Sequence, residues 1–164
     1  PKIEIFAQKL IYLFENNKKL LICGNGGSAS DAQHLSSELL GRFEKSRKSF
    51  AAISLSTDTS ALTAIGNDYG FDNIFSRQIE GLGNPGDILL VISTSGFSKN
   101  LINAVDTAKL KSMETIGLLG RDGGSLKNLV DFEITIPNYK TCRIQEAHSL
   151  LIHIICQLIE DDIV

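Results

Sequence analysis

The residues best suited to chemistry lie in two short segments rich in small and hydroxyl side chains. They read Gly24-Asn25-Gly26-Gly27-Ser28-Ala29 and Ser93-Thr94-Ser95-Gly96-Phe97-Ser98. Each follows an apolar run typical of a buried strand and precedes a sequence typical of a helix. Free backbone N–H groups, hydroxyl donors and the positive end of a helix dipole together suit a phosphate group. The segments therefore predict a phosphorylated small molecule, held in a cleft at the carboxyl ends of the strands.

Other interpretations of these two segments explain less. A helix has one N-cap residue, whereas four hydroxyl side chains surround Gly96, at Ser93, Thr94, Ser95 and Ser98. The first segment also fits the dinucleotide pattern G-x-G-x-x-A, which needs an acidic residue at the end of the next strand. Asp58 comes too late for that role, and the second segment would have no function. Dinucleotide binding is therefore the weaker interpretation.

Two predicted helices carry side chains that could move protons or bind a metal ion. His34 and Glu38 are four residues apart, and Gln145 and His153 lie in one row of the last helix, so each pair shares a face. Each histidine could equally be an ordinary core or surface group, and Glu38 a solvated one. Leucines at 35, 39 and 40 instead favour a buried carboxylate, which must be compensated or functional. The same four donors could bind a divalent ion, most commonly zinc, so acid/base catalysis and ligation both stay open. His148 falls off this row and is left out of the predicted site.

Composition indicates one globular domain. The 164 residues are 43% hydrophobic, and the net charge of −3 argues against nucleic acid as the main partner. Cys23, Cys142 and Cys156 show no CxxC spacing, which favours free thiols in the cytoplasm. No signal peptide or apolar run long enough to span a membrane is present. Because the sequence starts at Pro1, we expect the N-terminal helix to be truncated.

Apolar periodicity predicts alternating strands and helices. We expect strands at 20–23, 50–55, 87–92, 114–119 and 132–136. We expect helices at 3–14, 28–40, 60–65, 71–82, 98–110 and 143–160, with a short one ending at Leu129 and Ser28 as an N-cap. This alternation predicts a parallel sheet covered on both faces. The first and last helices are more apolar than one sheet face needs, which favours burial between subunits.

Five motifs in order, from about Leu20 to the C-terminus, resemble those of the phosphoheptose isomerases, which are SIS (sugar isomerase) domain proteins. They are Cys23-Gly24-Asn25-Gly26-Gly27-Ser28-Ala29, His34…Glu38-Leu39-Leu40-Gly41-Arg42-Phe43, Asn67-Asp68-Tyr69-Gly70, Ser93-Thr94-Ser95-Gly96 and Arg143-Ile144-Gln145-Glu146…His153. The resemblance implies a single SIS domain over 1–164, a flavodoxin-like three-layer αβα sandwich with a five-stranded parallel sheet. It implies a cytoplasmic homotetramer with active sites between subunits. The implied reaction converts D-sedoheptulose 7-phosphate to D-glycero-D-manno-heptose 7-phosphate, the first step toward activated heptose for bacterial lipopolysaccharide or capsule.

The resemblance also implies roles for single residues. Glu38 resembles the general base and His153 the general acid, while in some members zinc is bound by His34, Glu38, Gln145 and His153. The implied substrate-binding residues are Asn25, Gly26, Gly27, Ser28, Arg42, Asn67, Asp68, Ser93, Thr94, Ser95, Ser98 and Gln145. Two residues depart from the family pattern, Phe97 where Asn is common and Cys142 where Asp is common.

Two related classes of protein are the alternatives. A non-enzymatic SIS protein that binds the replication initiator DnaA has a similar fold and loops. It lacks the glutamate and the last-helix histidine, both of which are present here as Glu38 and His153. The SIS modules of transcription factors are attached to a DNA-binding segment, and this sequence contains none. The enzyme is therefore the favoured prediction.

Overall fold

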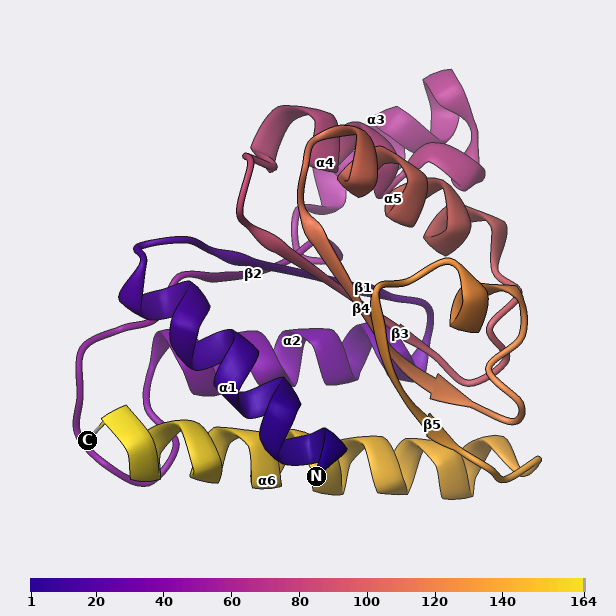
Figure 1. Cartoon of the computed structure of the whole chain (residues 1–164). Helices are drawn as coiled ribbons and strands as arrows, with labels where there is room; N and C mark the ends of the chain where they lie inside the picture. Colours follow the sequence, from indigo (N-terminus) through magenta and orange to yellow (C-terminus); the bar gives the residue numbers. More distant parts are fainter. Residues whose placement is uncertain (164) are drawn as a thin grey trace.

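The computed structural model, which describes residues 1–163, has five parallel strands in one sheet between two layers of helices (Figure 1). The strands are β1 (Leu20–Gly24), β2 (Ala52–Ser54), β3 (Ile88–Ser93), β4 (Glu114–Gly120) and β5 (Phe132–Ile136). The helices are α1 (Lys2–Glu15), α2 (Gly27–Leu40), α3 (Thr59–Tyr69), α4 (Ser76–Leu82), α5 (Lys99–Leu110) and α6 (Thr141–Ile163). Two 3₁₀ turns, η1 (Phe71–Asn73) and η2 (Ser125–Asn128), complete the described chain. The predicted αβα sandwich is confirmed.

The sheet separates two apolar cores. In Figure 1, α1, α2 and α6 lie on one side of the sheet, and α3, α4 and α5 lie on the other. Successive strand residues point to opposite faces. Leu20 and Ile22 of β1 accordingly belong to the first core, and Leu21 and Cys23 to the second. Because both faces are covered, the strands read as continuous apolar runs.

The strand order β2-β1-β3-β4-β5 is that of flavodoxin-like folds. Its order reverses between β1 and β3, and ligands of such sheets bind outside the carboxyl ends of the strands at that switch point. Gly24, the last residue of β1, lies in register with Ile92 of β3. The two segments rich in small residues therefore leave neighbouring strands side by side, where a ligand is expected.

Two local predictions were wrong. We expected Gly66-Asn67-Asp68 to separate two helices, but α3 runs through all three and ends at Tyr69, before the C-cap Gly70, whose φ of 84° suits glycine. A glycine inside a helix costs only about 1 kcal/mol, which packing can offset. The predicted N-cap Ser28 instead lies inside α2, whose N-cap is Gly26 at a φ of 58°.

The cysteines match the prediction of free thiols. Cys23 and Cys156 are buried, Cys142 is exposed, and none forms a disulfide. Burial raises the pKa of the Cys23 thiol, and it raises that of Cys156 to about 12, so both remain protonated and unreactive. No helix within residues 1–163 is long and apolar enough to cross a membrane.

Candidate functional site

The two small-residue loops enclose a cavity at the carboxyl ends of β1 and β3. Its volume is about 50 Å³, which suits a small group such as a phosphate. The residues that line it are Asn25, Ser28, Ile92, Ser93, Thr94, Ser95, Ser98 and Leu101. The structure thus brings together the five hydroxyl side chains that the sequence assigned to a phosphate, although they come from loops about 70 residues apart.

The hydroxyl groups of Ser93 and Ser98 in the second loop differ in their hydrogen bonds. Ser93 is buried, and its Oγ accepts a hydrogen bond of 2.9 Å from the backbone N–H of Gly96, which shapes the turn. Ser98 is the N-cap of α5, yet its side chain forms no capping hydrogen bond. Its hydroxyl and the first N–H groups of α5 therefore remain for a ligand. This result supports the prediction that helix capping does not account for all of these hydroxyls.

A reciprocal amide pair joins the two loops. Asn25 Nδ2 donates to Asn100 Oδ1 and Asn100 Nδ2 donates to Asn25 Oδ1, both at 2.9 Å. Asn100 is 2% exposed in the first turn of α5. Sequence reasoning missed Asn100, although a polar residue at a buried helix position was the available signal. The pair ties the first loop, at Asn25, to the start of α5, which follows the second loop.

Close backbone packing fixes the second loop from its other side. Gly96 has a φ of 74°, and a Cβ there would overlap the backbone of Gly123. The carbonyl of Gly96 accepts a hydrogen bond of 3.1 Å from Leu126 N–H at η2. Only glycine fits this position, because both its backbone conformation and the space around it exclude a side chain.

Gln145 reaches the first loop from α6. A Cβ on Gly27 would overlap Gln145 Nε2, so the amide lies directly against the first residue of α2. The glycine pair at Gly26 and Gly27 therefore has two separate uses. Gly26 supplies a positive φ, and Gly27 makes room for the Gln145 side chain.

His34, Glu38 and His153 meet between α2 and α6. His34 Nε2 lies 3.3 Å from Glu38 Oε1 and 3.2 Å from His153 Nε2. The two imidazole rings are perpendicular, with centroids 4.9 Å apart. A contact between two ring nitrogens at this distance is a hydrogen bond when one nitrogen carries the proton and the other a lone pair. The predicted shared face of His34 and Glu38 is confirmed, as is their approach to His153.

The environment of Glu38 is more open than the sequence suggested. Leu35 and Leu39 are buried, but Leu40 is 49% exposed because it lies on the outer side of the last turn of α2. The Glu38 side chain itself is 24% exposed. Its carboxylate can therefore be reached by a ligand, and the prediction of a buried carboxylate at Glu38 was wrong.

The donor set suits zinc in part. Among residues 1–163, no group of three or more His, Cys, Asp and Glu side chains is arranged to hold a metal ion. The two separations made by His34 Nε2, 3.2 and 3.3 Å, nevertheless resemble those of neighbouring zinc ligands. Donors at 2.0–2.1 Å from a tetrahedral zinc lie about 3.3 Å from each other. The spacing of His34 from Glu38 and from His153 is thus compatible with zinc, whereas Gln145 is not one of the usual zinc ligands.

Three other predicted site residues lie on the surface. Asn67 and Asp68 are exposed near the end of α3, where Asn67 Nδ2 donates to Asp68 Oδ1 at 2.8 Å. Arg42 is exposed after α2, and its Nη1 donates to the carbonyl of Glu44 at 3.2 Å. None of the three lines the cavity between the loops.

His148, which was left out of the predicted site, belongs to the interior. It is completely buried on α6, and its Nε2 lies 3.1 Å from the carbonyl of Leu119. Burial lowers the pKa of His148, against the opposing effects of that hydrogen bond and of Asp31. Ser149 Oγ donates to Asp31 Oδ1 at 2.9 Å beside it. Within the described residues His148 Nδ1 and Asp31 Oδ2 have no partner.

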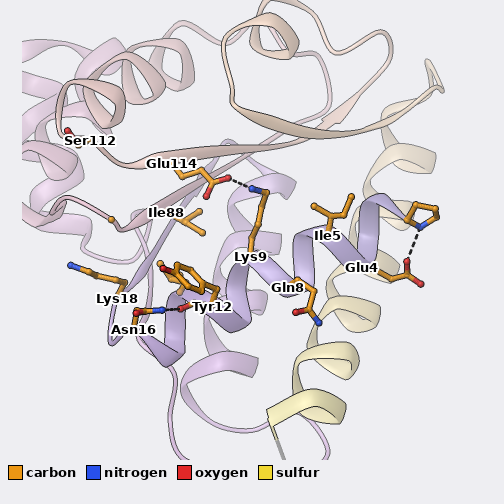
Figure 2. Close-up of a pocket in the computed structure, with 13 residues that line it drawn as sticks. Glu4, Ile5, Gln8, Lys9, Tyr12, Asn16, Lys18, Ile88, Ser112 and Glu114 are labelled. Carbon is orange, nitrogen blue, oxygen red and sulfur yellow. Dashed lines mark hydrogen bonds and ion pairs between the residues drawn. The ribbon is translucent and has the colours of Figure 1, made fainter.

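A much larger cavity lies away from these residues. Figure 2 shows it along α1, with Ile5, Lys9 and Tyr12 on one side and Ile88 and Glu114 on the other. Its volume is about 790 Å³. Ile88 and Glu114 are the first residues of β3 and β4, so the cavity lies at the amino ends of the strands. Size alone therefore does not locate the site, because the cavity lined by hydroxyl side chains lies at the opposite, carboxyl ends of the strands.

Comparisons with known proteins agree with this geometry. The family model "SIS domain" matches residues 1–120. A relative from a Nitratiruptor species, named phosphoheptose isomerase, is 53% identical over 162 residues, covering 98% of this chain and 87% of its own. A phosphoheptose isomerase structure from Francisella tularensis matches with a TM-score of 0.95 at 43% identity, over 98% of this chain and 86% of its own. A phosphoheptose isomerase structure from Neisseria gonorrhoeae matches with a TM-score of 0.91 at 47% identity, over 97% of this chain and 85% of its own. By sequence and by fold, the chain belongs to the SIS domain family.

Proposed function

We propose that this protein is a ketose–aldose isomerase that converts D-sedoheptulose 7-phosphate to D-glycero-D-manno-heptose 7-phosphate through an enediol. The observation that carries the proposal is the series of contacts from Glu38 through His34 to His153, which places acid/base groups from two helices together. Relatives that match nearly the whole chain are named phosphoheptose isomerase, which supports this substrate. The product supplies activated heptose for lipopolysaccharide or capsule. The DnaA-binding alternative finds no support in the comparisons.

The phosphate of the sugar binds in the cavity between the two loops. The free Ser98 hydroxyl and the N-terminus of α5 supply donors and a favourable dipole. The phosphate is remote from the reacting carbons and is held alike in ground and transition states. Its binding energy therefore serves to hold C1 and C2 of the sugar in register with the catalytic groups.

Proton transfer follows from the paired helices. Glu38 removes a proton from C1 while His153 gives a proton to the oxygen on C2, which forms the enediol. His153 then takes the proton from the oxygen on C1, and Glu38 returns its proton to C2. Hydrogen and electrons are only redistributed within the sugar, so the reaction consumes no oxidant or reductant. His34, in contact with both groups, orients them.

The direct test is an NMR assay of the purified protein with sedoheptulose 7-phosphate in deuterated water. We expect aldose signals to appear and deuterium to enter at C2, because the proton that Glu38 has taken from C1 exchanges with solvent before C2 is protonated. The assay is run once with a chelator and once with added zinc. If the ketose stays unchanged under both conditions, the proposed activity is contradicted.

Zinc is a second part of the proposal. His34, Glu38, Gln145 and His153 would hold the ion, and the donor spacing around His34 supports this. Zinc would polarise the substrate carbonyl or hydroxyl oxygens. Elemental analysis of the purified protein and of a His34→Ala variant tests this directly. Equal zinc content in the two proteins would contradict His34 as a ligand.

We further propose a homotetramer whose active sites lie between subunits. His153 is exposed at the edge of the site, which leaves one side of the substrate open to a neighbouring chain. Tyr12 on α1 and Leu150 on α6 are 70% and 61% exposed, and such apolar surface favours association. A cytoplasmic location suits the three free thiols.

A further inference from the structure

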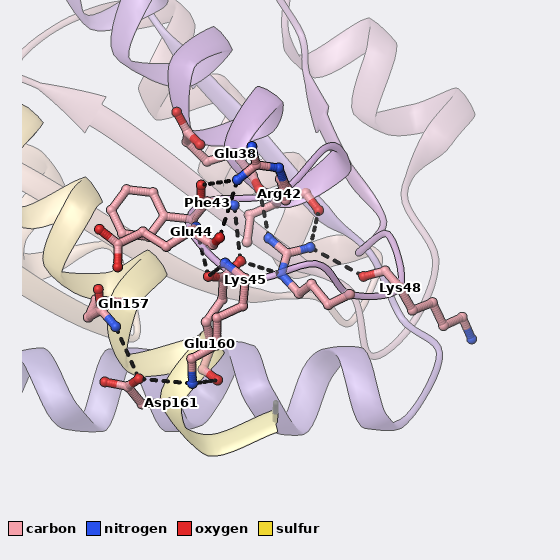
Figure 3. Close-up of polar contacts among 11 residues, drawn as sticks. Glu38, Arg42, Phe43, Glu44, Lys45, Lys48, Gln157, Glu160 and Asp161 are labelled. Carbon is pink, nitrogen blue, oxygen red and sulfur yellow. Dashed lines mark hydrogen bonds and ion pairs between the residues drawn. The ribbon is translucent and has the colours of Figure 1, made fainter.

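A buried carboxylate near the end of α6 organises the segment that follows α2. The Glu160 side chain is 0% exposed. Its carboxylate oxygens accept four hydrogen bonds, from the backbone N–H groups of Phe43, Glu44 and Lys45 and from Arg47 Nε, at 3.0, 2.9, 2.7 and 2.8 Å (Figure 3). A buried charge is costly unless it is paired and hydrogen-bonded. This one is fully satisfied, so it acts as a fixed anchor.

The anchored segment has no regular structure of its own. Residues 41–51 connect α2 to β2 without a helix or strand. Three consecutive N–H groups in it converge on one carboxylate, and Lys45 Nζ also donates to the backbone carbonyl of Glu160 at 3.1 Å. Since backbone donors of an irregular segment need partners, the conformation of 41–51 depends on Glu160.

Arg47 extends the anchor to the helix that carries Glu38. The guanidinium, 3% exposed, binds Glu160 through Nε, while Nη2 donates to the carbonyl of Glu38 at 2.7 Å and Nη1 to that of Leu39 at 3.0 Å. The last carbonyls of a helix lack partners within it, and a cation suits that end of the helix dipole. The Glu160–Arg47 pair thus fixes the turn of α2 from which the Glu38 side chain leaves.

Phe43 extends the anchor to His153. Its backbone is held by Glu160, and its ring centroid lies 5.6 Å from that of the His153 imidazole, tilted by 37°. His153 precedes Glu160 by seven residues, about two helical turns, so both face the 41–51 segment from α6. The other side of His153 meets His34. The imidazole is therefore held between a ring that Glu160 positions and a ring on α2.

We propose that Glu160 is a positioning residue that sets the alignment of Glu38 with His153. It acts on Glu38 through Arg47 and on His153 through Phe43. This rests on the proposed isomerase function, in which those two groups exchange protons with the sugar. Glu160 does not line the cavity proposed for the phosphate. Its effect is therefore expected in turnover and not in substrate binding.

The test is Glu160→Gln, which keeps the side-chain shape but places an NH₂ group against donors. We expect kcat to fall about tenfold to a hundredfold, the range expected for misplacement by up to about 1 Å. KM should stay within about twofold. Glu160→Asp, which keeps the charge, should recover part of kcat. The matched control is Glu114→Gln, which removes an ion pair with Lys9 of 2.5 Å at the amino end of β4 and should leave kcat unchanged.

A second readout does not depend on activity. The ring C–H signals of His153 in a ¹H–¹³C spectrum at fixed pH should shift in Glu160→Gln and stay in place in Glu114→Gln. If Glu160→Gln does not fold, Phe43→Ala decides, because it removes the ring beside His153 and leaves the anchored backbone. A folded Glu160→Gln or Phe43→Ala variant with unchanged kcat and unchanged His153 signals overturns the proposal. A different outcome is wild-type protein that is inactive on the sugar, together with His153 signals that shift in Glu160→Gln. That result would refute the proposed function and leave the positioning of His153 by Glu160 supported.

Discussion

At the scale of single residues, Glu38 and His153 have different degrees of freedom. The backbone of Glu38 is fixed by Arg47, whereas its carboxylate remains partly exposed beside His34. The His153 ring is bounded by Phe43 and His34 but opens to solvent. A base and an acid that are held in place and still reachable are what enediol chemistry requires.

Replacing Glu38 by Gln should lower kcat at least ~10²-fold, in line with the usual contribution of a general base. Gln keeps the shape, so the thermal unfolding midpoint should change little. Solvent-deuterium incorporation into the sugar, measured at equal metal content, is the sharpest readout. Glu80→Gln is the control, because it removes an exposed ion pair with Arg77 on α4. Normal deuterium exchange in Glu38→Gln would mean that another group takes the proton.

Glu160 should make stability depend on acid pH. Burial alone would raise its pKa, but hydrogen bonds from Lys45, Phe43, Glu44 and Arg47 outweigh this and lower the pKa from 4.5 to about 2. A lowered folded-state pKa gives stability that is present above pH 4.5 and is lost as pH falls toward 2, about 3 kcal/mol in all. Urea unfolding at pH 7, 4 and 3 should show the gap between wild type and Glu160→Gln narrowing. A gap independent of pH contradicts this linkage.

The sequence predicted side chains that belong to a local motif, and it could not predict those whose only signal is a contact with a distant segment. The His34 and Glu38 pairing follows from helix spacing, and the loop hydroxyls follow from the strand–loop–helix pattern. Asn100 and Glu160 escaped notice because their partners lie 75 and about 116 residues away. Such contacts depend on how whole helices pack, which no local pattern records.

At the scale of elements, the cavity proposed for the phosphate depends on the loop after β3, which packs at Gly96 against the backbone of Gly123 and Gly124. Gly96→Ala should raise KM more than it lowers kcat, because the added Cβ pushes the loop from the Gly123 backbone and strains a positive φ. Gly81→Ala in α4 is the control, since a Cβ there meets nothing within 4 Å, and it should be neutral or slightly stabilising. An unchanged KM in Gly96→Ala would argue against phosphate binding at this loop.

The elements themselves were largely predictable, because all five strands and the main helices follow strong apolar periodicity. The exceptions were positions where a single residue, such as the glycine in α3, was expected to end a helix. Gly66 lies inside α3, where a glycine costs only about 1 kcal/mol, and a Cβ there would meet only Ile74, at 3.7 Å, so the position does not require glycine. Expected helix breakers therefore failed where the surroundings were permissive.

At the scale of the whole molecule, the exposed apolar residues of α1 and α6 predict association. Light scattering at micromolar concentration should give a tetramer. Leu150→Glu should shift the equilibrium from tetramer toward smaller species, because a charge would be buried at the interface between subunits. Leu110→Glu is the control, since Leu110 is 88% exposed at the end of α5 on the opposite layer. A wild-type protein that remains monomeric contradicts the shared-site assembly.

The contact between His34 and His153 spans 119 residues of chain. On the ribosome, the two loops that cradle the phosphate are synthesised by about residue 101, long before α6 appears. The proposed acid His153, the Gln145 amide and the Glu160 anchor all belong to that final helix. With these roles, turnover requires α6, so a chain truncated before α6 is expected to be inactive. In this proposal, activity therefore depends on the helix that is synthesised last.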